Sequence, residues 1–128
     1  MKIESSYLFE FLVPLYPELR HQLVASADCW LTEAGRISTC SVFSITSDLV
    51  IQRISAGDFS GAKELFAGIE RCLADGSDEV STAATTCFLE NLINRQDIGV
   101  LVVPFMGSLA RQYCRAWDKF TGVTTPGL

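Results

Sequence analysis

The sequence predicts an all-α fold, and three observations support this prediction. Apolar residues recur at helical spacing along most of the 128-residue chain. Glycine, proline and helix-capping residues separate the periodic stretches. Hydrophobic residues make up 48% and charged residues 20%, a composition typical of a globular domain. We therefore expect a compact bundle of about five to six helices, in which stacked helical hairpins would give a HEAT-like appearance.

The N-terminal part predicts two helices. Tyr7 to Leu12 carries the apolar stripe of a short first helix. A second helix is expected from Pro17 to about Trp30, because proline fits the first turn, where its missing N–H costs nothing.

A loop and a third helix are expected next. Residues 31–40 contain a glycine turn and indicate a connection. Residues 41–56 have apolar residues at helical spacing, although their β-branched and serine content lowers helix propensity. Gly57 is a natural stop, so this stretch is predicted to be a helix.

The C-terminal half predicts a helical hairpin and a closing helix. Asp58 is suited to cap the fourth helix, and Ser77 or Asp78 the fifth. The link between these two helices is short, so they should pack as an antiparallel pair. A last helix is expected over residues 108–120, which gives one domain at residues 1–121 and a frayed, dispensable tail at residues 122–128.

The charge balance limits the classes of partner. The net charge is −5, and no run of basic residues is present, which argues against nucleic acid. An acidic surface suits a basic protein partner or simply keeps the protein soluble. The N-terminus has no signal-peptide pattern, and the apolar stretch at residues 98–106 is too short to span a bilayer, so we expect a cytoplasmic protein with no membrane association.

Five cysteines occur, an odd number without CxxC pairing. A secreted disulfide framework would favour an even number at tight spacing. Most of these cysteines have apolar neighbours, so the sequence predicts reduced core residues. They are Cys29, Cys40, Cys72, Cys87 and Cys114.

Motifs for catalysis or cofactor binding are absent from the sequence. His21 is the one histidine, and no HExxH, CxxC, GxGxxG or P-loop pattern occurs. We therefore expect no catalytic residues, no metal and no cofactor. An enzyme that pairs a cysteine with His21 remains as an alternative, although the sequence selects no particular cysteine.

Residues that could bind a partner lie at the predicted helix ends. Trp30 ends a helix beside a loop, a position suited to an aromatic anchor. Carboxylates at helix–helix turns could accept a partner's lysines and arginines, and a turn is an improbable place for an acid–base cleft. The candidate partner-binding residues are Trp30, Glu33, Asp75, Asp78 and Glu79.

Three segments together resemble a family of small, all-helical bacterial proteins. They are YPEL at 16–19, LADGSDEVSTAATTCFLENL at 73–92 and GSLARQYCRAW at 107–117. Members of that family are often proposed to be immunity proteins made beside a polymorphic or contact-delivered toxin. Residues 35–48 differ from the family pattern, which is more aromatic there and contains a histidine.

The resemblance implies a protein that binds a cognate toxin acting in the cytoplasm and blocks its active site. Such an antidote needs a rigid scaffold and a complementary surface, with charge opposite to that of the toxin's groove. The alternative is a helical adaptor or regulatory subunit of a bacterial complex.

Overall fold

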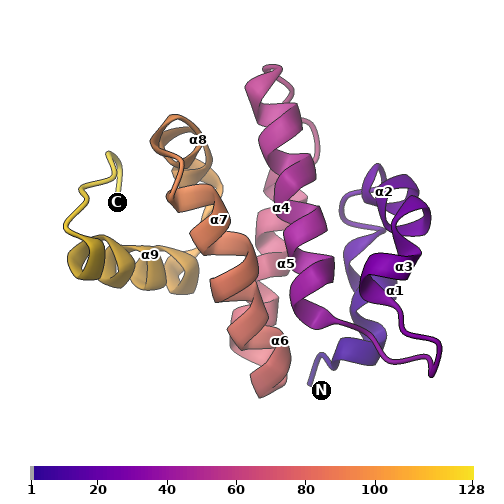
Figure 1. Cartoon of the computed structure of the whole chain (residues 1–128). Coiled ribbons are helices and arrows are strands. Elements are labelled where there is room, and N and C mark those ends of the chain that lie inside the picture. Colours follow the sequence, from indigo (N-terminus) through magenta and orange to yellow (C-terminus); the bar gives the residue numbers. More distant parts are fainter. Residues whose placement is uncertain (1) are drawn as a thin grey trace.

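The computed structural model describes residues 2–128 and confirms the all-helical class (Figure 1). Within these residues there are no strands, only two isolated bridges that join Ile3 to Gly76 and Leu31 to Ile37. There are more helices than the five to six expected, because two of the expected helices are subdivided. The elements are η1 (Ser5–Tyr7), α1 (Leu8–Leu12), α2 (Leu19–Ala25), α3 (Ala27–Trp30), α4 (Thr39–Ser55), α5 (Ala62–Asp75), α6 (Asp78–Ala83), the π-helix η2 (Ala84–Leu89), α7 (Glu90–Ile93), α8 (Gln96–Val102), η3 (Val103–Phe105) and α9 (Ser108–Thr121).

Helix α4 is the long central element, with α1 to α3 on one side of it and α7 to α9 on the other in Figure 1. The prediction of a helix here is confirmed despite its β-branched and serine content. Ser38 caps the helix by accepting the N–H of Ser41. Phe43 and Val50 are buried, so tertiary packing overrides the low helix propensity.

The predicted antiparallel hairpin is confirmed. Helix α5 packs against the continuous rod formed by α6, η2 and α7, and only Gly76 and Ser77 link the two. A Cβ at position 76 would lie 2.2 Å from the Cys72 carbonyl oxygen, so the turn requires glycine. Ser77 then caps α6 by accepting the N–H of Val80 at 3.2 Å.

The rod changes from α-helix to π-helix at Ala84–Leu89. Just after this segment, the Asn91 side-chain amide donates to the Cys87 carbonyl oxygen at 2.7 Å and contacts Ser47 Oγ at 3.1 Å. One apolar stripe at intervals of four residues remains fully buried along the whole rod. It consists of Val80, Ala84, Phe88 and Leu92.

The expected helix from Pro17 to Trp30 divides at Ser26, whose backbone leaves the helical region (φ −110°, ψ 21°). The Trp30 indole N–H donates to the Leu23 carbonyl oxygen at 2.7 Å and satisfies an acceptor at the end of α2. This long-range use of an indole is not visible in the helical periodicity.

Helix α9 begins where another helix supplies its cap. The Glu70 carboxylate on α5 accepts the backbone N–H of Leu109 at 2.6 Å and that of Ala110 at 3.0 Å. Gly107 leaves space for this side chain, since a Cβ there would lie 2.5 Å from Glu70 Cδ. An acceptor 39 residues away in the sequence therefore caps the final helix.

Residues 122–128, expected to be a frayed tail, fold back onto α9. The backbone N–H and the hydroxyl of Thr125 both donate to the Asp118 carboxylate, at 2.7 and 3.0 Å. Arg115 Nε donates to the Leu128 carbonyl oxygen at 2.9 Å. The packing of Thr125, which is 4% exposed, corrects the picture of a tail without contacts.

Candidate functional site

A cleft of about 590 Å³ lies between the beginning of α4 and the rod formed by α6 and η2. Residues of α6 and η2 form one wall, and the first residues of α4 with their cap form the other. The lining residues are Ser38, Thr39, Cys40, Asp78, Glu79, Thr82, Ala83, Thr86 and Cys87.

Two capped helix N-termini position the side chains of this cleft. Ser38 precedes α4 and Ser77 precedes α6, and each accepts a backbone N–H from the first turn of its helix. The N-terminal strand-like segment holds the second turn in place, because Ile3 N–H donates to the Asp75 carbonyl oxygen at 2.8 Å. Ser77 N–H donates to the Ile3 carbonyl oxygen at 2.9 Å.

A hydroxyl of α4 fixes one carboxylate of α6 across the cleft. Thr39 Oγ1 donates to Glu79 Oε1 at 2.6 Å and is also hydrogen-bonded to Ser5 Oγ at 2.7 Å. Thr39 is 4% exposed, whereas Glu79 is exposed, so the buried hydroxyl orients a carboxylate that faces solvent.

The end of the molecule that carries this cleft is acidic. The exposed carboxylates of Asp75, Asp78 and Glu79 gather where α5 ends and α6 begins. Arg71 Nε lies 3.9 Å from Asp75 Oδ2, and both side chains are at least half exposed. No ion pair within residues 2–128 involves Asp78 or Glu79.

A disulfide between Cys40 and Cys87 lines the same cleft, with a Cα–Cα distance of 5.4 Å. It corrects the expectation that all five cysteines are reduced core residues. The two cysteines are 47 residues apart, and only the packing of α4 on η2 brings them together. Sequence spacing therefore could not identify the pair.

The other cysteines match the expectation in part. Cys72 and Cys114 are free and buried, and burial raises the pKa of each thiol to about 12. Neither thiol is a nucleophile near neutral pH, since the thiolate is the reactive form. Cys29 is free and exposed, contrary to the expectation of a core position.

Trp30 and Glu33 lie outside the acidic cleft. Trp30 is 7% exposed and stacks on Phe9 with ring centroids 5.8 Å apart. Its indole contributes to an apolar groove of about 410 Å³ that also includes exposed Val24 and Leu31. Glu33 is exposed in the loop between α3 and α4. The structure thus groups the three carboxylates and places the aromatic residue and Glu33 elsewhere.

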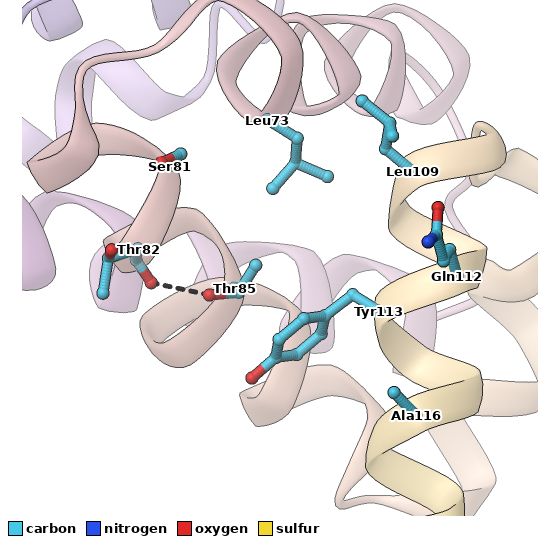
Figure 2. A pocket seen from close by; sticks show the side chains of 8 residues that line it. All are labelled: Leu73, Ser81, Thr82, Thr85, Leu109, Gln112, Tyr113 and Ala116. Carbon is cyan, nitrogen blue, oxygen red and sulfur yellow. Dashed lines mark hydrogen bonds between the residues drawn. The ribbon is translucent and has the colours of Figure 1, made fainter.

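A second cleft of about 520 Å³ lies on the other flank of the rod, against α9 (Figure 2). Tyr113 reaches across from α9 toward η2, and its hydroxyl donates to the Glu90 carboxylate (Figure 2). Burial, and then this carboxylate, raise the pKa of Tyr113 to about 12. Thr82 lines both clefts, so they flank the same helix. This cleft contains hydroxyl, amide and apolar groups but no carboxylate, histidine or cysteine.

No arrangement for metal or Cys–His chemistry is present within residues 2–128. No group of three or more His, Cys, Asp or Glu side chains there could hold a metal ion. His21 is exposed on α2, and no hydrogen bond in this part of the chain joins it to a cysteine. None of the helices formed by these residues is both long and apolar enough to cross a membrane.

Sequence reasoning missed several residues of the acidic cleft. Thr39 and Cys40 were assigned to a loop, although they form the first turn of α4. Thr82 and Thr86 have no motif, and their role depends on the helix crossing. The Ser–x–x–Ser spacing at Ser38 was the one local signal of a helix cap that would have extended α4 to Thr39.

Comparison with known proteins identifies one family. The model of a family described as "Domain of unknown function (DUF7674)" matches residues 9–122. No curated protein matches the chain. No solved structure matches it either.

Proposed function

Because the chain belongs to the DUF7674 family, whose description names no activity, we propose a function from the site itself: an immunity protein that binds a cognate bacterial toxin and blocks its active site. The observation that carries this proposal is the acidic cleft, where Asp78 and Glu79 are exposed on a hydrogen-bonded helix N-terminus. The partner would be a toxin domain with a basic active-site surface that acts in the cytoplasm.

The scaffold around the cleft supports binding by a preformed surface. Within residues 2–128, no buried side-chain nitrogen or oxygen lacks a hydrogen-bond partner. The two capping serines and the Thr39–Glu79 hydrogen bond hold the cleft walls without a ligand. A preorganised surface loses little conformational entropy on binding, which favours a tight complex.

The charge of the cleft supports a basic partner. Carboxylates in the first turn of a helix are stabilised by its dipole, so Asp78 and Glu79 stay ionised at neutral pH without a cationic neighbour. Their unpaired charge raises the rate of encounter with a cationic surface. Lysine or arginine side chains of a nuclease-type or similarly basic groove would complete the missing ion pairs.

The proposal is tested by co-expression with the product of the neighbouring gene. We expect that product to stop growth when expressed alone, and this protein to restore growth and co-purify with it. The double variant Asp78→Asn/Glu79→Gln should weaken binding by about tenfold or more, mainly through charge pairing. The control variant Glu64→Gln removes an exposed carboxylate near the opposite end of the α5 hairpin and should bind normally.

The outcomes separate the candidate functions. A harmless or non-binding neighbour would overturn the immunity proposal. A stable complex with a non-toxic protein, found by pull-down, would favour the adaptor or regulatory subunit instead. Equal binding by the double variant and by Glu64→Gln would show that a toxin, if bound, is held by another surface.

A further inference from the structure

The disulfide in the acidic cleft is reachable from solvent on one side only. Cys40 is exposed, whereas Cys87 is 8% exposed within the π-helix η2. Both residues line the cleft, so a small molecule that enters it meets the bond at Cys40. A thiolate attacks a disulfide at the more accessible sulfur.

Helix α4 supports the chemistry at this sulfur. Cys40 lies in the first turn of a 17-residue helix, where the helix dipole favours a thiolate. Ser44 Oγ lies 3.9 Å from Cys40 Sγ and donates to it, because a disulfide sulfur carries no hydrogen. After exchange, the released Cys40 thiolate would retain both interactions.

The carboxylates of the cleft impose a charge preference. Asp78 and Glu79 line it together with the disulfide, and no cation within residues 2–128 pairs with either. A thiol with an ammonium group is attracted to this site, whereas a thiol with net negative charge is repelled. The site therefore selects among small thiols by charge.

We propose that the Cys40–Cys87 disulfide is a thiol-exchange site whose preferred co-reactant is a small cationic aminothiol. The aminothiol thiolate forms a bond to Cys40 Sγ, the Cys40–Cys87 bond breaks, and the electron pair leaves on Cys87 Sγ, which takes a proton from water. A second aminothiol attacks the mixed disulfide, releasing the small disulfide and the Cys40 thiolate. Two thiols are oxidised and the protein disulfide gains two electrons.

This site does not depend on the proposed function, because it requires no protein partner. It is consistent with the cytoplasmic location expected from the sequence, since disulfides of cytoplasmic proteins are usually transient or redox-active. An oxidised cleft and a reduced cleft would then be two forms of the same binding surface.

The experiment uses the purified oxidised protein in a Cys29→Ser background, which removes the exposed free thiol. Cysteamine and glutathione are compared at equal thiolate concentration, and the adduct is mapped by peptide mass spectrometry. We expect the mixed disulfide on Cys40 and a rate for cysteamine about tenfold above that for glutathione. In Asp78→Asn/Glu79→Gln this ratio should fall toward the ratio measured with a model disulfide, while Glu64→Gln should leave it unchanged.

Three results would overturn the proposal. One is a protein whose five native cysteines all titrate as free thiols when it is unfolded without reductant. Another is an adduct that forms on Cys87, which would place the accessible sulfur on the other helix. The third is a rate ratio that does not respond to the loss of both carboxylates. Circular dichroism of each variant before the reaction confirms that the fold is retained.

Discussion

Replacement of Glu70 by alanine removes the cap of α9 without touching that helix. The carboxylate accepts two backbone N–H groups, at 2.6 and 3.0 Å, and side-chain caps of this kind contribute about 2 kcal/mol at most. We expect Glu70→Ala to lower the free energy of unfolding by about 2 kcal/mol. For a chain of 128 residues this corresponds to a fall in Tm of about 7 °C.

Gly107 makes the reasoning sharper, because a Cβ there would meet Glu70 rather than backbone. The backbone of Gly107 (φ −78°, ψ −177°) is accessible to any residue, so Gly107→Ala should act only by displacing the carboxylate. It should cost about 2 kcal/mol in the native chain. In the Glu70→Ala background it should cost under about 1 kcal/mol, because the smaller unfolded-state entropy offsets the weaker cap.

The assay is a double-mutant cycle measured by urea unfolding. The expected coupling between the two sites is about 1 to 2 kcal/mol, within the range for residues in contact. Glu33→Gln removes an exposed carboxylate from a loop and serves as the control, with an expected change within about 0.5 kcal/mol. Additive effects of the two substitutions would refute the argument that Gly107 exists to admit Glu70.

Three further outcomes follow from the packing and the thiols. Deletion of residues 122–128 should lower the free energy of unfolding by about 2 kcal/mol through lost hydrogen bonds to α9, and an unchanged Tm in a thermal melt would contradict this. Reduction of the Cys40–Cys87 bond, which closes a separation of 47 residues, should cost about 4 kcal/mol through unfolded-state entropy, and equal urea midpoints with and without reductant would argue against it. Folding raises the pKa values of Cys72 and Cys114 from 9.0 to about 12, so the folded state holds protons that the unfolded state loses, and stability should be complete below pH 9 and should fall between pH 9 and 12; a urea midpoint that stays flat over this range would exclude that linkage.

Local signals were sufficient to predict most of the helices. The apolar period and the caps at Ser77 and Asp78 identified the α5–α7 hairpin, and the spacing in residues 108–120 identified α9. The helix over residues 41–56 was predicted because its flanks outweighed its weak propensity, and burial of its apolar face explains why that was correct. These features depend on neighbours within a few turns.

Long-range contacts could not be predicted in the same way. The break at Ser26, the cap from Glu70 and the Cys40–Cys87 bond each join groups whose meeting depends on helix crossings. For the candidate site, carboxylates near a helix start were predictable as a local cluster, but their neighbours Thr39 and Cys40 belong to a different helix. Periodicity describes which face of a helix is apolar, not which other helix covers it.

The π-helix at Ala84–Leu89 fixes the length of the chain in that region. Loss of one residue there would allow a regular α-helix and would rotate all that follows by about 100° about the axis. Val80 and Leu92, both fully buried, could then no longer face the core together. We expect relatives to tolerate insertions and deletions in the exposed loop at residues 31–36 but to keep a constant number of residues between Val80 and Leu92.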